Sequence, residues 1–264
     1  MTDDATPAAA ASAAPGDLEA GFEAALDAVA DVEGWMTPDQ ARRLWDRAGT
    51  TVPGQRIVEI GSFRGRSAIV LARAAPVGVE VVAIDPHLGS DRGPQEIAAD
   101  PELGDSDFEV FSENLRRGGV ADRVRHVRAL SADALDEVDA PIQVLYIDGA
   151  HRYGPARDDI RDWGARVADG GTLLIHDSFS SIGVTFAILD QLALSGRFRY
   201  CGRSTSLAEY RREPLRGGAR ARNFFRQLGQ LPWFLRNVMI KVLITVHLTP
   251  LTRLLGHRGG DWPY

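Results

Sequence analysis

Acidic and imidazole side chains recur along this sequence at the points where apolar runs end. Seven of them lie within such runs or shortly after them: Glu59, Asp85, Asp133, Asp148, His151, His176 and Asp177. Carboxylates at the ends of buried strands need solvent, a hydrogen-bond partner or a cation. Because the carboxyl ends of parallel strands meet at one edge of a sheet, we expect these groups to surround a single ligand-binding crevice.

Two of these carboxylates, Asp148 and Asp177, end neighbouring predicted strands and can converge. Two uncompensated carboxylates in one cleft would raise the pKa of one of them unless a cation lies between them. Hard oxygen ligands favour Mg²⁺, whereas the adjacent imidazole of His176 favours Mn²⁺, iron or zinc. The residues therefore predict a cation site made of Asp148, Asp177 and His176, with Mg²⁺ or Mn²⁺ as the ion, and leave open the alternative that no metal is needed.

A turn containing two glycines follows the apolar run 56–60, in the order Glu59-Ile60-Gly61-Ser62-Phe63-Arg64-Gly65. Its glycines can adopt backbone angles that other residues avoid, and the helix that follows begins with unpaired N–H donors. The second and third glycines of the dinucleotide fingerprint are missing, which disfavours a nicotinamide oxidoreductase. No phosphate loop follows either, because the only lysine in the chain is Lys241. The turn predicts a ligand cradle, with a purely structural βα turn as the alternative.

Composition and charge divide the chain unevenly. The 264 residues carry a net charge of −6, but the segment from Arg211 onward has ten basic residues against Glu213 and Asp261. A single cysteine, Cys201, excludes an internal disulfide and fits a reducing compartment. The first 16 residues lack the apolar core of a signal peptide, so we expect a disordered lead and a cytoplasmic protein.

Strand-length apolar runs alternate with segments of helical periodicity over about 150 residues, which predicts a doubly wound, mostly parallel α/β sheet. The helices are expected at 17–30, 37–48, 107–117, 153–167 and 182–194. The parallel strands are expected at 56–60, 80–84, 124–130, 142–147 and 172–175, and an antiparallel pair at 198–202 and 206–211. Residues 88–105 are predicted as a long loop with one helical turn at 95–99, and 169–171 as a turn.

The Glu59-x-Gly61-x-x-x-Gly65 turn, with Asp85 ending the next apolar run, resembles the corresponding motif of the class I S-adenosylmethionine-dependent methyltransferases. Two further segments, Ile147-Asp148-Gly149-Ala150-His151 and Gly170-Gly171 leading to His176-Asp177, are similar to those of bacterial small-molecule O-methyltransferases of the macrocin and catechol type. The resemblance covers residues 35–211. It implies a Rossmann-like seven-stranded sheet with N-terminal helices and a helical C-terminal extension.

The resemblance also implies roles for individual residues. The cofactor would be held by Glu59, Gly61, Ser62, Gly65, Ser67, Asp85, Asp133 and Asp148. His151 would remove the proton of an acceptor hydroxyl, with Asp148 as the second catalytic residue, and a near-neutral pKa suits that task. For His151 the alternative is a structural histidine bound to a backbone carbonyl, and for Asp133 it is simple surface exposure. His176 stands where some metal-using relatives carry a second acid.

The implied function is methyl transfer from S-adenosylmethionine to a hydroxyl of a small molecule, a sugar or a lipid-linked glycan. Transfer at an activated carbon needs alignment and proton removal but no covalent nucleophile. The competing function is a non-catalytic nucleotide-fold module that recruits a partner to a membrane. Nothing in the sequence resembles a nucleic-acid-binding module.

The C-terminal segment differs from the body in composition. Residues 1–16 form the lead, 17–211 the methyltransferase domain and 212–264 a basic, apolar helical tail in this prediction. Within the tail, residues 224–255 are too interrupted for a membrane span, and with Trp233 and paired phenylalanines they favour an interfacial helix on an anionic membrane. A helix packed on its own domain and a homo-oligomer contact are the alternatives.

Overall fold

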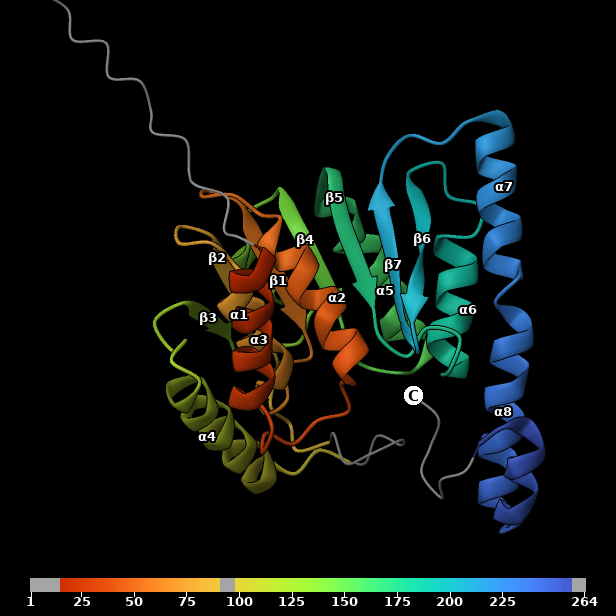
Figure 1. Cartoon of the computed structure of the whole chain (residues 1–264), viewed down its shortest axis with the longest axis horizontal. Helices are drawn as coiled ribbons and strands as arrows, with labels where there is room; N and C mark the ends of the chain where they lie inside the picture. Colours follow the sequence, from red (N-terminus) through yellow and green to blue (C-terminus); the bar gives the residue numbers. More distant parts are fainter. Residues whose placement is uncertain (1–14, 91–97, 258–264) are drawn as a thin grey trace, which may run out of the picture.

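The computed structural model describes residues 15–90 and 98–257 of the chain. Seven strands form one sheet in the order β3-β2-β1-β4-β5-β7-β6. The five parallel strands are β1 (Arg56–Ile60), β2 (Glu80–Ile84), β3 (Val124–Val127), β4 (Ile142–Ile147) and β5 (Val167–Ile175). β7 (Leu207–Arg212) joins β5 in antiparallel fashion, and β6 (Phe198–Ser204) closes the edge. This order confirms the predicted doubly wound, mostly parallel sheet of seven strands (Figure 1).

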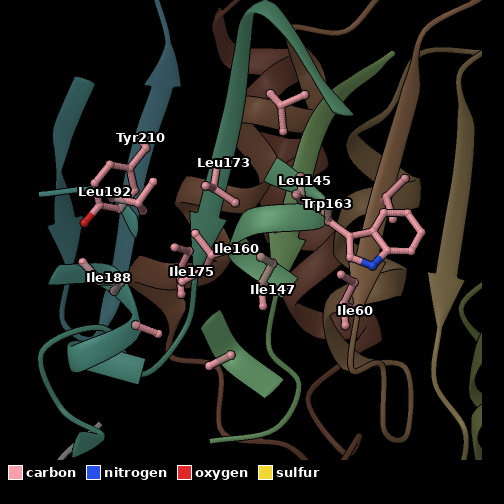
Figure 2. Close-up of a cluster of buried hydrophobic side chains, with 14 of the residues drawn as sticks. Ile60, Leu145, Ile147, Ile160, Trp163, Leu173, Ile175, Ile188, Leu192 and Tyr210 are labelled. Atoms are coloured by element: carbon pink, nitrogen blue, oxygen red, sulfur yellow. The ribbon is translucent and has the colours of Figure 1, made fainter. Parts of the chain in front are cut away.

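Helices cover both faces of this sheet because alternate residues of the central strands are apolar on opposite sides. Val81, Ala83 and Tyr146 pack with side chains of α1 (Pro15–Ala28), α2 (Pro38–Gly49), α3 (Arg66–Ala74) and α4 (Pro101–Arg117). Val82 and Leu145 pack on the other face with α5 (Tyr153–Asp162) and α6 (Ile182–Gln191). The second cluster includes the fully buried Trp163 (Figure 2).

Several predicted boundaries shift in the structure, each for a local reason. α4 begins at Pro101 rather than at residue 107, because Asp100 caps the amides of Glu102 and Leu103 and proline suits the first helical turn. The loop predicted for 88–105 is therefore shorter. The helical turn expected at 95–99 lies mostly outside the described residues, and the described residues 98–100 are not helical.

Strand β5 starts at Val167, five residues before its predicted start. Residues 169–171 bulge within it, because Ile142 pairs with Val167 whereas Val144 pairs with Thr172. Gly170 permits this bulge with a φ of +76°. At the other end of the chain, α1 already begins at Pro15, inside the predicted lead, and residues 1–14 of that lead lie outside the described residues.

The tail is helical, as predicted, and packs along the β6 edge of the sheet (Figure 1). It contains α7 (Gly217–Leu228), α8 (Leu231–Thr245) and a 3₁₀ helix, η3 (Thr249–Leu255). In α7 the buried side-chain amide of Asn223 accepts a hydrogen bond from Tyr200 N (2.8 Å) and donates one to Phe198 O (3.0 Å). These two backbone groups belong to the edge strand β6 and are not satisfied by β7. Asn223 therefore fastens the tail to the domain.

Replacing Asn223 with alanine is expected to lower the free energy of unfolding by about 1–3 kcal/mol, because two buried backbone groups lose their partner. Chemical denaturation measures the loss. Arg222→Ala, at an exposed position beside it, is the matched control and should stay within about 0.5 kcal/mol of the native chain. Equal effects of the two substitutions would contradict this account of the tail.

Candidate functional site

The turn between β1 and α3 forms the floor of the site. Gly61 has a φ of +83°, and a Cβ added there would lie 2.2 Å from the backbone oxygen of Asp148. Only glycine allows this approach of two strand ends. Gly65, with a φ of +86°, precedes α3 as its N-cap residue and faces Phe111 rather than the cavity.

Asp85 holds this turn in shape. Its Oδ2 accepts from the backbone N–H groups of Ser62 (2.8 Å) and Phe63 (2.7 Å), and its Oδ1 accepts from His87 N (2.7 Å). Burial raises the pKa of Asp85, and these three hydrogen bonds oppose the rise. In this structure Asp85 thus engages the main chain of the turn, in addition to lining the cavity beside it.

Glu59 lies fully buried on β1, two residues before the turn. Within the described part of the chain, neither of its carboxylate oxygens has a hydrogen-bond partner. Burial raises the pKa of Glu59 to about 8, a rise that the nearby hydroxyls of Ser67 and Ser62 limit. Burial without a hydrogen-bond partner thus favours the neutral, protonated form of Glu59.

A cavity of about 500 Å³ opens at the carboxyl ends of the parallel strands. The predicted site residues that line it are Gly61, Ser62, Ser67, Asp85, Asp148, His151, His176 and Asp177. Glu59 and Gly65 stand outside the lining, and Asp133 is exposed at the surface, with its neighbours Ser131 and Ala132 lining the cavity in its stead. The fold therefore gathers eight of the eleven predicted residues around one space.

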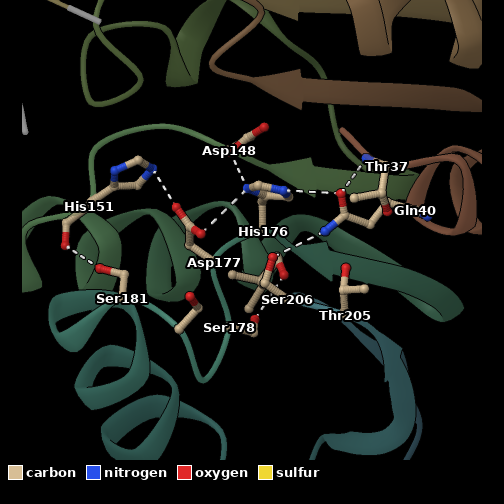
Figure 3. Close-up of polar contacts among 12 residues, drawn as sticks. Thr37, Gln40, Asp148, His151, His176, Asp177, Ser178, Ser181, Thr205 and Ser206 are labelled. Atoms are coloured by element: carbon tan, nitrogen blue, oxygen red, sulfur yellow. Dashed lines mark hydrogen bonds and ion pairs between the residues drawn. The ribbon is translucent and has the colours of Figure 1, made fainter. Parts of the chain in front are cut away.

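His151 and Asp177 form an ion pair on the wall of this cavity (Figure 3). His151 Nε2 lies 2.9 Å from Asp177 Oδ2, and the histidine is about one-third exposed. Burial alone would lower the pKa of His151, but the hydrogen bond and the charge of Asp177 outweigh it and raise the pKa above its usual value. The same pairing, with the positive charges of His176 and Lys241, holds the pKa of Asp177 well below its usual range despite burial.

Asp148 is held from two sides. Tyr146 donates its hydroxyl to Oδ2 (2.7 Å), and His176 Nδ1 lies 3.0 Å from Oδ1. The other ring nitrogen of His176 is 3.4 Å from Gln40 Oε1, an oxygen that also accepts from Thr37 N at 2.8 Å (Figure 3). Since an acceptor faces each ring nitrogen, this arrangement favours the doubly protonated imidazolium. Burial opposes that charge, but Asp148 and Asp177 raise the pKa of His176 to about 9.

This arrangement does not fit the predicted cation site of Asp148, Asp177 and His176. The nitrogen that would have to coordinate a metal, Nδ1, lies 3.0 Å from Asp148 Oδ1 and 3.9 Å from Asp177 Oδ1, at ion-pair distances. An imidazolium has no lone pair for a metal. Within residues 15–90 and 98–257 there is also no group of three or more His, Cys, Asp or Glu residues arranged to bind a metal ion. When protonated, His176 places a positive charge beside Asp148 and Asp177, where the sequence prediction placed a metal.

Sequence reasoning missed three contributors to the site. Tyr146 stands near the end of β4, and its place two residues before Asp148 puts both side chains on one face of the strand. Gln40 is visible in the sequence as part of a Thr37-x-x-Gln40 capping box, which the structure forms. Trp35 and Phe63 stack with ring centroids 5.5 Å apart and line the cavity, a pairing across 28 positions that no local pattern indicates.

Changing Gly61 to alanine is expected to destabilise the fold more than the same change at Gly54. Both glycines have nearly the same φ, +83° and +85°, but a Cβ at position 54 meets nothing within 4 Å. Gly54→Ala should cost about 1–2 kcal/mol from backbone strain, and Gly61→Ala should exceed it by about 2 kcal/mol or more through the clash with Asp148. Denaturant titration measures the free energy of unfolding of both variants. Equal losses would show that the close approach of Gly61 to the Asp148 backbone is unimportant.

Comparison with known proteins relates this chain to methyltransferases. Residues 58–178 match the model of a methyltransferase domain family. The ribosomal RNA small subunit methyltransferase G of Mycobacterium leprae is 36% identical over 139 residues, 46% of this chain and 55% of that protein. A catechol O-methyltransferase of Mycobacterium tuberculosis is 30% identical over 144 residues, 54% of this chain and 56% of that protein. The chain thus spans about half the length of these curated relatives.

The fold agrees with these matches. The O-methyltransferase of Bacillus cereus, solved in complex with S-adenosylhomocysteine, superposes with a TM-score of 0.52 over 76% of this chain and 92% of that one, at 17% identity. The site also fits a cofactor with positive charges, because six carboxylates and two arginines line the cavity and the buried Ser62 hydroxyl has no hydrogen-bond partner among the described residues. Residues 58–178 thus match a methyltransferase domain, and the whole chain has the Rossmann-like fold of the class I methyltransferases.

Proposed function

We propose that this protein transfers the methyl group of S-adenosylmethionine to a hydroxyl of a small molecule, such as a sugar or a natural-product scaffold, with His151 as the general base. The observation that carries the proposal is the His151–Asp177 pair on the cavity wall. The O-methyltransferase names of the catechol enzyme and the Bacillus cereus structure support oxygen as the accepting atom. Six carboxylates around the cavity and a net charge of −6 favour a small acceptor over a polyanionic RNA.

The bound cofactor would supply a methyl group on a positively charged sulfur. In the chain, Asp177 orients the His151 ring by accepting from Nε2, which leaves Nδ1 as the basic nitrogen of the neutral ring. Nδ1 would take the proton of the acceptor hydroxyl while the oxygen forms its bond to the methyl carbon, and the bond from that carbon to sulfur would break with its electron pair left on a neutral sulfur. Asp148, held by Tyr146 and His176, keeps a fixed negative charge beside the Gly61 turn. No covalent enzyme intermediate is needed.

His151→Ala is expected to lower kcat about 10²-fold or more, because the positioned base is lost. The affinity for S-adenosylhomocysteine should stay within about twofold, since Ser62, Asp85 and the Gly61 turn remain in place. Labelled methyl transfer to a panel of hydroxyl acceptors measures the first quantity. His247→Ala, on the exposed end of the tail, is the control and should keep normal turnover.

An unchanged kcat in His151→Ala would remove the general-base role. If the native chain binds S-adenosylhomocysteine but methylates no hydroxyl acceptor in the panel, the non-catalytic module that the sequence left as an alternative becomes the better account. Cofactor binding without turnover thus distinguishes the two functions.

The pH dependence follows from the direction of the His151 shift. The neutral ring is the active form and its pKa is raised, so activity should increase with pH and level off above the ordinary histidine range. Asp177→Asn removes the carboxylate that raises this pKa, so the midpoint of the kcat/KM profile should move to lower pH. A midpoint that stays fixed in Asp177→Asn would show that the titrating group is not His151.

We also propose that turnover does not depend on a divalent cation, because His176 Nδ1 lies 3.0 Å from Asp148 Oδ1 and 3.9 Å from Asp177 Oδ1, and the protonated ring would provide the positive charge there. Dialysis against EDTA should leave at least about 80% of the activity, whereas a tightly metal-dependent site would lose nearly all of it. His176→Asp, which restores a second acid, should lower activity and make the remainder respond to added Mg²⁺ or Mn²⁺. Loss of native activity in EDTA, with recovery on adding a metal, would overturn the proposal.

A further inference from the structure

Helix α8 carries an apolar stripe on its exposed side. Leu235, Met239 and Val242 of the helix, and Val246 directly after it, are spaced four, three and four residues apart, and each is between 52% and 59% exposed. That spacing places them on one face of a helix. Exposed leucines continue the apolar surface into the segment that follows, at Leu248, Leu251 and Leu254. In Figure 1 the helix and η3 form the outer margin of the molecule on the β6 side.

Two polar side chains of α8, Asn237 and Lys241, point toward the domain, and a third, Arg236, points toward η3. Asn237 Nδ2 donates to Phe179 O (3.3 Å), Lys241 Nζ donates to Ser180 O (3.1 Å), and Arg236 Nε donates to Leu255 O (2.7 Å). A surface helix normally buries its apolar side and exposes its polar side. Here the hydrogen bonds of Asn237 and Lys241, together with the buried side chains of Phe234 and Ile240, fix the helix so that Met239 and the rest of the stripe stay outside. An apolar stripe held outward in this way is typical of a contact surface.

Charge indicates which partner this surface suits. The described tail residues 217–257 include Arg220, Arg222, Arg226, Arg236, Lys241 and Arg253 and no acidic residue, in a protein whose net charge is −6. A second copy docked through the same surface would bring two basic tails together, which electrostatics opposes. An anionic lipid surface accepts both features, because its headgroups attract arginine and its acyl boundary accepts aliphatic side chains.

In the structure, the tail residues exposed for contact with a bilayer differ from those that the sequence favoured. Trp233, the residue that the sequence favoured as an interfacial anchor, packs between the guanidinium groups of Arg203 (4.2 Å) and Arg236 (5.0 Å). The aliphatic stripe therefore provides the exposed contact in its place, together with Phe225 of α7, which is two-thirds exposed. No helix among the described residues is both long and apolar enough to cross a membrane, so the contact would be a peripheral one.

We propose that the outer face of α8 and η3 binds the surface of an anionic lipid bilayer and holds the domain there peripherally. The aliphatic stripe enters the interface, and the arginines of α7 and η3 contact the headgroups. This surface is separate from the cavity and does not depend on the methyl-transfer proposal.

Vesicle sedimentation with the full chain tests this docking. Binding to phosphatidylcholine vesicles containing about one-third phosphatidylglycerol should exceed binding to pure phosphatidylcholine at least about tenfold and should weaken as salt is added. Met239→Glu combined with Val242→Glu should lower binding at least about tenfold. Val77→Glu, at an exposed apolar position on the body of the domain, is the matched control and should leave binding unchanged.

Circular dichroism and binding of S-adenosylhomocysteine verify that each variant remains folded, since none of these residues lines the cavity. Equal binding to neutral and anionic vesicles, or no binding to either, would overturn the proposal. So would a native chain that is dimeric in solution and that Met239→Glu converts to monomers, because the stripe would then be a subunit interface.

Discussion

The structure depends on neutralising several carboxylates that the fold collects at one edge of a sheet. Parallel strands place Asp85, Asp148 and Asp177 around a single cavity, and buried like charges cannot persist without partners. Backbone amides satisfy Asp85, while imidazoles compensate Asp148 and Asp177. This compensation preserves a negatively charged cavity and orients the histidines within it. A negatively charged cavity of this kind suits a cofactor with a positive sulfur.

The contacts that compensate these carboxylates join distant parts of the chain. Gln40, at the start of α2, bridges His176 at the end of β5 and donates to Ser206 before β7. On the other side, α8 contacts the loop that follows Asp177 through Asn237 and Lys241. The N-terminal helices and the tail therefore both support the strand ends where the proposed chemistry takes place. The same inward contacts of α8 leave Leu235, Met239 and Val242 exposed, which links the support of the site to the proposed membrane surface.

The fold was largely predictable because its signals are local: apolar runs of strand length, the Gly61 turn and the Thr37 cap each depend on neighbouring residues. Placement of the strand-end acids followed from the parallel topology, and eight of the predicted site residues line the cavity. Asp133 lies at the surface because the chain turns directly after β3, a geometry that side-chain type does not reveal. The charge state of His176 was equally hidden, since it depends on Gln40, which lies 136 positions away.

The central claim is that these strand ends form one pocket shaped for S-adenosylmethionine and its product. Isothermal titration calorimetry of the native chain with S-adenosylhomocysteine tests it most directly, because binding needs the pocket but neither an acceptor nor catalysis. We predict a single saturable site with one molecule bound per chain and a dissociation constant in the micromolar range, about 1–100 μM. Absence of binding at millimolar ligand by a folded chain would contradict the account.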